Sequence, residues 1–239
     1  MPYMGKVLST LNWSVKSNYS RSSNRKGDVL GLDKAERLLH SLFKRKKKLV
    51  LGIYGAPNAG KTTLANRISK DCKVKPKGII SEIPHETREV VKIENLNLNV
   101  DNKTLQLTVL DTPDLATKIS HLEFIKYGLS ELEAIQRAKE AIKGIRDAIE
   151  SMNEINAAIV VIDSTKFPYE QINIIIVESL EAKGKPVIIV ANKIDLPEAK
   201  PELVKKFFPN HQVIPISALT GQNIEKLYKA LANLDRNNL

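Results

Sequence analysis

The sequence has little of what defines several protein classes. The 239 residues include one cysteine, Cys72, so an internal disulfide and a zinc site built on paired cysteines are both excluded. Aromatic residues make up only 5%, and no apolar run is long enough to cross a bilayer. The first residues show no signal-peptide pattern. We therefore expect a protein of the reducing cytoplasm, with a hydrophobic share of 42% that is enough for a core.

Acidic residues are scarce in only one part of the chain. Residues 1–48 hold 12 Lys+Arg against 3 Asp+Glu, a net charge of +9, whereas residues 49–239 carry a net charge of +1. Residues 9–26 are rich in Ser, Asn and basic side chains without apolar periodicity, and we expect them to be flexible. Leucines at helical spacing in residues 33–44 predict a short amphipathic helix. We divide the chain into a basic N-terminal extension, 1–48, and a globular domain, 49–239.

Short apolar strands alternate with amphipathic helices from Leu49 onward, a pattern typical of an α/β fold with a mostly parallel sheet and helices on both faces. Alternating apolar residues on both sides of Asp101 and Asn102 predict a hairpin, and hence one antiparallel strand among six. The predicted strands are 49–54, 90–100, 103–110, 157–162, 186–191 and 212–216. The predicted helices are 61–69, 130–152, 168–182, 201–207 and 223–234.

The longest predicted helix, 130–152, has an apolar stripe at helical spacing. We predict that this stripe faces the hydrophobic core, as such stripes usually do. Its members are Leu132, Ile135, Ile142, Ile145, Ile149 and Met152.

A glycine-rich turn follows the first predicted strand. The segment GAPNAGKT matches the P-loop pattern GxxxxGK[ST], and it lies between a strand and a helix, as that pattern requires. Its backbone N–H groups would bind a polyphosphate at the helix N-terminus, Lys61 would reach the β- and γ-phosphates, and Thr62 would bind Mg²⁺. Asp111 ends the third strand and would act on Mg²⁺ through water. The predicted binding residues here are Gly55, Ala56, Pro57, Asn58, Ala59, Gly60, Lys61, Thr62, Thr63 and Asp111.

Two further motifs follow the fifth and sixth strands, Asn192-Lys193-Ile194-Asp195 and Ser217-Ala218-Leu219. Together with the P-loop and Asp111 they resemble the TRAFAC class of P-loop GTPases, in particular its Era-like branch. The sequence is most similar to archaeal Era-like GTP-binding proteins, through GAPNAGKTT, Pro84-His85-Glu86-Thr87-Arg88 and the long helix after Asp111. The resemblance covers residues 49–239 and implies a P-loop GTPase domain that binds GTP or GDP with Mg²⁺.

The resemblance also implies how the base is bound. In that family the Asp of the NKxD motif accepts two hydrogen bonds from guanine, and here this role falls to Asp195. Asn192 would orient the base and tie its loop to the P-loop, while the stem of Lys193 would pack over the purine. The backbone N–H of Ala218, between Ser217 and Leu219, would meet guanine O6. Adenine would leave the carboxylate without partners, so we expect guanine nucleotides.

The predicted catalytic residues are Lys61, Thr87, Asn58 and Asp114. Thr87 resembles the switch I threonine that binds Mg²⁺ and senses the γ-phosphate, which makes Thr62, Thr87 and Asp111 the predicted metal ligands. Asn58 resembles the P-loop asparagine that helps to bind K⁺ in several Era-like GTPases, and we leave K⁺ open as a further cofactor.

Asp114 departs from the family. The family usually has DxxG where this chain has Asp111-Thr-Pro-Asp114, and Ras-type GTPases have a water-orienting Gln where it has Leu115. An Asp in place of the Gly puts a second negative charge near the γ-phosphate and restricts the backbone. We therefore expect slow hydrolysis or a resting state biased toward GDP.

The sequence indicates the macromolecular partners of this GTPase less clearly than its nucleotide. Era proteins carry a KH RNA-binding domain after the GTPase domain, and the chain stops at Leu239 without one, so we expect the GTPase domain alone. Residues 1–48 would release counterions on binding rRNA or a ribosomal subunit, with an anionic membrane surface as the alternative and no DNA sequence recognition. Three functions stay open: a slow GTPase switch in ribosome or RNA assembly, a non-hydrolysing GTP/GDP-binding scaffold, and a membrane-surface GTPase.

Overall fold

The computed structural model describes residues 48–77, 87–101, 103–116 and 119–237. Contacts separate residues 1–46 from residues 47–239, and the described residues all belong to the second unit. The predictions for the N-terminal extension therefore lie outside the described residues, as do His85 and Glu86.

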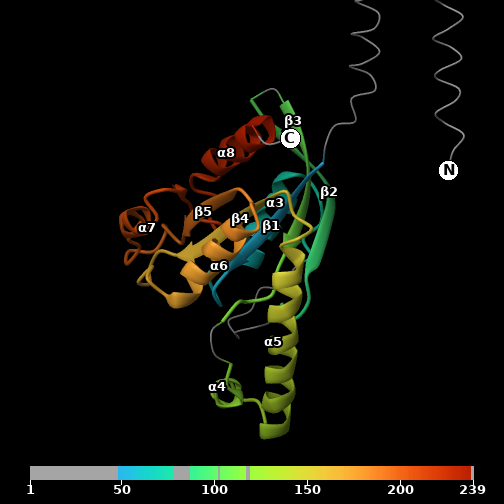
Figure 1. Cartoon of the computed structure of the whole chain (residues 1–239), viewed down its shortest axis with the longest axis vertical. Helices are drawn as coiled ribbons and strands as arrows, with labels where there is room; N and C mark the ends of the chain where they lie inside the picture. Colours follow the sequence, from blue (N-terminus) through green and yellow to red (C-terminus); the bar gives the residue numbers. More distant parts are fainter. Residues whose placement is uncertain (1–47, 78–86, 102, 117–118, 238–239) are drawn as a thin grey trace, which may run out of the picture. The chain divides into compact units, whose positions relative to one another are not determined.

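A six-stranded sheet forms the centre of the described unit, with strand order β2-β3-β1-β4-β5-β6 (Figure 1). The strand pairs are parallel except β2 with β3, which are antiparallel, so the predicted α/β fold is confirmed. The strands are β1 (Leu49–Gly55), β2 (Val91–Val100), β3 (Lys103–Asp111), β4 (Ala157–Asp163), β5 (Val187–Asn192) and β6 (Gln212–Pro215).

Helices cover both faces of the sheet because the central strands are apolar on both sides. In β4, Ala157, Ile159 and Val161 pack into one core with α3 and α8. Their neighbours in the strand, among them Val160, pack into the other core with α5, α6 and α7. The helices are α3 (Lys61–Asp71), α4 (His121–Ile125), α5 (Glu131–Ser151), α6 (Gln171–Ala182), α7 (Pro201–Phe207) and α8 (Ile224–Asn237).

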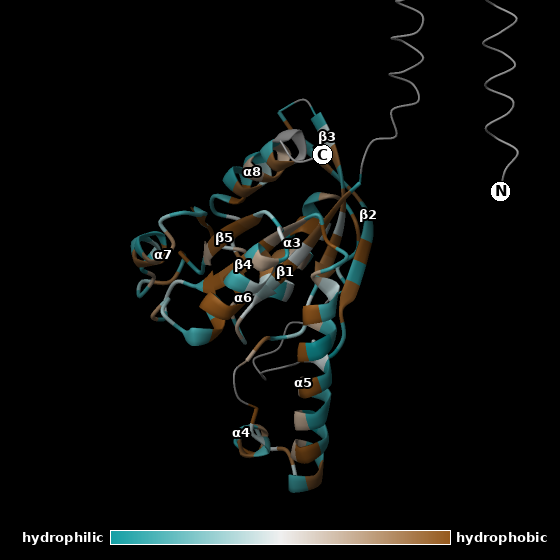
Figure 2. Cartoon of the chain, viewed as in Figure 1, coloured by the Kyte–Doolittle hydropathy of each residue, from teal (hydrophilic) through white to brown (hydrophobic). Residues whose placement is uncertain are grey.

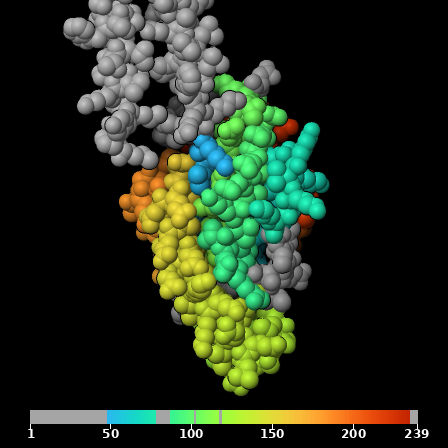
Figure 3. All heavy atoms as spheres, turned by 90° about the vertical axis from the view of Figure 1, so that its right-hand side faces the viewer, coloured from blue at the N-terminus to red at the C-terminus, as the bar shows by residue number. Residues whose placement is uncertain are grey.

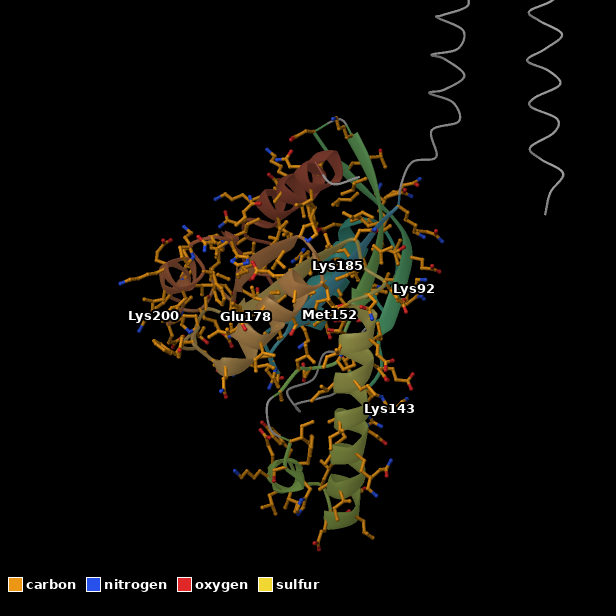
Figure 4. All side chains as sticks on the ribbon, in the orientation of Figure 1. Lys92, Lys143, Met152, Glu178, Lys185 and Lys200 are labelled. Carbon is orange, nitrogen blue, oxygen red and sulfur yellow. The ribbon has the colours of Figure 1, made fainter. Side chains whose placement is uncertain are left out.

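The predicted inward orientation of the apolar stripe on the long helix is wrong for most of its length. Leu132 is 82% exposed, Ile142 60%, Ile149 46% and Ile135 37%, and only Met152 is fully buried. The inner side of α5 consists mainly of small residues, Ala134, Ala141, Gly144 and Ala148, which allow close packing. Half of α5 also extends beyond the sheet and packs on α4 (Figure 1). Figure 4 places Met152 at the sheet end of the helix and Lys143 farther along it.

Three smaller features differ from the sequence-based expectation. The short helix α4 was not predicted, and α6 begins at Gln171, so Pro168 precedes the helix instead of lying in its first turn. The register of β2 against β3 shifts between Ile93 and Leu96, where Asn95 has a left-handed φ of 60°.

None of the helices in the described part of the chain combines the length and apolar character needed to cross a bilayer.

Candidate nucleotide-binding site

The carboxyl ends of the parallel strands bring the predicted site residues together. Ile53 of β1 pairs with Asp111 at the end of β3, and Asp163 at the end of β4 pairs with Asn192 at the end of β5. Ligands of open α/β sheets bind outside this edge, where the strand order reverses direction. Here the reversal occurs around β1, which leads directly into the P-loop.

Two glycines shape the P-loop. A Cβ at Gly55 would collide with the backbone carbonyl oxygen of Val161. A Cβ at Gly60 would collide with the side-chain nitrogen Nδ2 of Asn192. Gly60 also has a φ of 99°, a region open to glycine, and it is the residue from which α3 starts. Asn58 lies in the same turn with a left-handed φ of 58°. The turn therefore directs the N-terminus of α3 toward the strand ends, where an anion would meet the backbone N–H groups of the first helical turn.

Lys61 is the buried cation of the site, with only 4% of its surface exposed. Its Nζ donates to the carbonyl oxygen of Ala56 at 3.0 Å and to Oδ1 of Asp114 at 2.5 Å. Asp114 is itself 9% exposed, so the ion pair is shielded from solvent. The residue that departs from the family pattern thus contacts the lysine expected to bind phosphate.

Asp111 is fully buried, and neither of its carboxylate oxygens accepts a well-formed hydrogen bond from another described residue. Burial raises the pKa of Asp111 to about 6, the Thr62 hydroxyl and Lys61 oppose that rise, and Asp114 adds to it. The Thr62 and Thr87 hydroxyl oxygens lie 3.1 Å apart. A buried carboxylate with no well-formed hydrogen bond among the described residues, close to the Thr62 hydroxyl, fits a hard divalent cation such as Mg²⁺.

Asn192 joins three segments of the site. Its Nδ2 donates to the carbonyl oxygen of Ala59 in the P-loop at 2.9 Å, and its Oδ1 accepts from the backbone N–H of Ala218 at 2.9 Å. The carbonyl oxygen of Asn192 accepts the Ser164 hydroxyl. Asp195, three residues on, has an exposed side chain at the same edge. The side chain of one buried asparagine therefore holds the P-loop and residues 217–219 in a fixed relation.

The Ala218 N–H, which is expected to meet guanine O6, donates to Oδ1 of Asn192 in this structure. The loop at 217–219 is also bound by Arg67 of α3. The Arg67 guanidinium donates to the carbonyl oxygens of Ala218 and Leu219 at 3.3 and 2.6 Å. Ser217 is fully buried and its hydroxyl accepts from the Thr220 N–H at 3.0 Å.

Asp163 is a site residue that the sequence analysis missed. Its carboxylate accepts from Lys193 Nζ at 2.7 Å and from the N–H and hydroxyl of Thr165 at 3.0 and 2.7 Å. Burial alone would raise the pKa of Asp163, but these bonds hold it below its usual value. The ion pair fixes the position of Lys193, the residue expected to lie against the base. A polar residue ending the apolar run of β4 was the available signal.

These features define the class of the protein. A parallel sheet with a P-loop after its first strand, a buried aspartate at the end of the neighbouring strand and an NKxD segment after β5 belongs to a P-loop GTP-binding domain. Residues 50–193 match the family model described as 50S ribosome-binding GTPase. The chain belongs to this family of GTPases, and its resemblance to the Era-like branch is confirmed.

Curated relatives include the GTPase Era of Geotalea daltonii, 30% identical over 83% of this chain and 57% of that protein. Era of Clostridioides difficile is 31% identical over 77% of this chain and 54% of its own length. The chain therefore spans little more than half the length of these relatives.

Two solved structures of Era have the same fold. A variant of Aquifex aeolicus Era bound to GDP and AlF4⁻ aligns with a TM-score of 0.60 at 26% identity, over 79% of this chain and 57% of that one. Era in complex with MgGDPNP and nucleotides 1506–1542 of 16S ribosomal RNA aligns with a TM-score of 0.61 at 25% identity, over 80% and 57%.

Proposed function

We propose that this chain is a guanine-nucleotide switch that binds GTP and GDP with Mg²⁺ and hydrolyses GTP. The observation that carries the proposal is the buried Asp111 carboxylate, which accepts no well-formed hydrogen bond from a described residue and lies near Thr62 and the Lys61 ammonium at the end of a P-loop. A binding site for a metal-bound polyphosphate accounts for a carboxylate buried at this position. Family membership and the nucleotide-bound Era structures support the same proposal.

Each residue then has a task. The P-loop N–H groups and Lys61 would hold the β- and γ-phosphates, and Asp195 would accept the two N–H groups of guanine. The metal would be held by Thr62, Thr87 and Asp111, and it supplies neutralisation of the charge on the phosphates. Asn192 joins the P-loop to the loop at 217–219 through hydrogen bonds to Ala59 and Ala218. The Ala218 N–H would meet guanine O6.

We also propose that hydrolysis is slow because Asp114 competes with the γ-phosphate for Lys61. The 2.5 Å ion pair must open or be shared before Lys61 can bind phosphate fully. A carboxylate close to the γ-phosphate also repels it, whereas GDP, one phosphate shorter, is less affected. This ion pair favours a second candidate function, a guanine-nucleotide-binding scaffold without turnover.

Steady-state GTP turnover with Mg²⁺, measured in KCl and in NaCl at equal ionic strength with nucleotide binding in the same samples, tests both candidates. Turnover in either salt supports the switch, and a higher rate in K⁺ assigns a cation-binding role to Asn58. Tight GTP binding without turnover supports the scaffold. No binding of guanine nucleotide contradicts both.

We propose a ribosomal subunit or rRNA as the partner, in the cytoplasm, with residues 1–48 as the electrostatic contribution. Their net charge of +9 and the rRNA in the Era complex support this proposal. Removal of residues 1–44 should weaken co-sedimentation with ribosomes at physiological salt. The same variant tested with anionic liposomes separates this from the membrane alternative, since loss of liposome binding alone would contradict the ribosomal proposal.

A further inference from the structure

Helix α5 has a regular seven-residue repeat of apolar residues, only part of which is exposed. Ile135, Ile142 and Ile149 are spaced by seven, and Ala138, Ile145 and Met152 follow each of them by three residues. This is the a/d pattern of helices that pack along another helix, with β-branched Ile at every a position. The a positions extend over about 21 Å of helix, at a rise of about 1.5 Å per residue.

Only half of this pattern has a partner within the described fold. The d positions turn inward, since Met152 is buried and Ala138 and Ile145 pack partly against the two cores beside α5. The a positions remain 37%, 60% and 46% exposed at Ile135, Ile142 and Ile149. Figure 2 shows hydrophobic bands alternating with hydrophilic ones along α5, and Figure 3 shows α5 as part of the molecular surface. Isolated exposed apolar residues are ordinary, but three isoleucines in one helical row are not.

The helix that presents this row is firmly held. Ser130 and Glu133 form a capping box at its start, with the Glu133 carboxylate accepting from the Ser130 N–H at 2.9 Å. At Gly144 the helix approaches the nucleotide site so closely that an added Cβ would lie 3.0 Å from Pro113 and 3.1 Å from the carbonyl oxygen of Arg88. The row is therefore a preformed surface, and ordering it on binding costs little.

Charge at the edge of the row indicates the partner. Lys139 and Arg146 follow the isoleucines at the same spacing of seven, on the outward flank. The Arg146 side chain is 68% exposed, and its contact with Asp147 is long, at 3.9 Å. We propose that this face of α5 binds an amphipathic helix of another protein, whose apolar stripe is flanked by acidic residues that meet Lys139 and Arg146. Recognition of this kind places a helix along a preformed apolar row.

A second copy of the chain fits the row less well. In an antiparallel pair, Lys139 and Arg146 would face the same cations of the other copy, and like charges in contact repel. In a parallel pair they would face Ala134, Ala141 and Ala148, which are buried inside the fold.

A synthetic peptide of about 20 residues tests the proposal on the full chain. The probe has Ile at a, Leu at d and Glu at the flanking positions, and a comparison peptide has Lys in place of Glu. Fluorescence anisotropy should show that the acidic peptide binds about tenfold or more tightly than the basic one. Ile142→Glu should weaken binding of the acidic peptide by about tenfold or more. The pair Lys139→Glu and Arg146→Glu should reverse the preference between peptides.

The matched control is Ile175→Glu on α6, a residue that is 46% exposed but lies outside the row. It should leave peptide binding unchanged, and all variants should keep their unfolding midpoint because the altered side chains are exposed. Equal binding of the two peptides, no binding, or an equal loss with Ile175→Glu would overturn the proposal. Self-association in sedimentation that Ile142→Glu abolishes would assign the face to a second copy and overturn it as well.

Discussion

At the scale of single residues, the Lys61 ammonium donates to the Ala56 carbonyl and to the Asp114 carboxylate within the described part of the chain. A buried lysine with a carboxylate partner is stable without a ligand, so an incoming phosphate must replace an interaction instead of filling an empty position. The affinity for GTP then depends on how the γ-phosphate compares with Asp114 as a partner.

Two substitutions of Asp114 distinguish the effect of its negative charge from the effect of its restricted backbone. We expect Asp114→Gly and Asp114→Asn each to raise the affinity for GTP relative to GDP by about tenfold, because both remove the competing carboxylate. Isothermal titration with GDP and a non-hydrolysable GTP analogue measures the ratio. An increase with Gly alone would attribute the effect to backbone conformation, and an unchanged ratio in both variants would contradict the competition.

Cys72, at the C-terminal end of α3, offers a pH-dependent test of how burial affects its thiol. Burial, with a smaller contribution from Asp71, raises the pKa of its thiol from 9.0 to about 11. The protonated thiol is therefore favoured in the folded state, and its contribution to stability is present below pH 9 and is lost as the pH rises through 11. At pH 8 alkylation by iodoacetamide should be about 100-fold slower in the folded than in the unfolded protein, since the thiolate is the nucleophile. Mass spectrometry measures this for the single cysteine, and equal rates would contradict it.

At the scale of elements, α5 shows what a hydrophobic pattern establishes and what it leaves open. The spacing of Leu132, Ile142 and Ile149 identified the helix and its apolar side, but not what that side contacts. The alanines and Gly144 on the opposite side pack more closely than larger residues would, and this tertiary preference decided the orientation. Periodicity contains no information on which of two faces finds a partner within the same chain.

The start of α5 provides a prediction for this element. Ser130→Ala removes the side chain that caps the helix and binds the Glu133 carboxylate, and it should lower the free energy of unfolding by about 1 kcal/mol. Urea denaturation measures the change. Glu131→Ala is the control, since it alters the same turn outside the capping box and should have a smaller effect.

At the scale of the whole molecule, the sequence predicted the sheet, its antiparallel hairpin and the segments at its carboxyl edge. Local motifs and strand alternation contain that information. It did not predict the hydrogen bond from Arg67 to the loop at 217–219 or the ion pair of Asp163 with Lys193, because these contacts join residues far apart in the chain. Helix α4 has a single turn and too few residues to form a recognisable pattern.

Asn192 tests how the distant segments depend on each other. Asn192→Ala leaves the Ala59 carbonyl and the Ala218 N–H without their partner, and it should lower the free energy of unfolding by about 2 kcal/mol and weaken guanine-nucleotide binding. Asn156→Ala is the matched control, because its Oδ1 accepts the Val50 N–H at 2.8 Å at the opposite end of the sheet. That variant should lose stability but keep nucleotide affinity, and a similar loss of affinity in both would contradict a local role for Asn192.

The two outer strands of the sheet also limit how the molecule associates. Within the described sheet β2 and β6 each have one neighbouring strand, so the outer edge of each has no strand partner there. The register shift at Asn95 and the exposed Lys92 and Glu94 interrupt β2, while β6 is only four residues long and ends at Pro215. Such edges are poor templates for a further strand and oppose amyloid-like stacking. Productive complexes must then form through side chains and not through extension of the sheet.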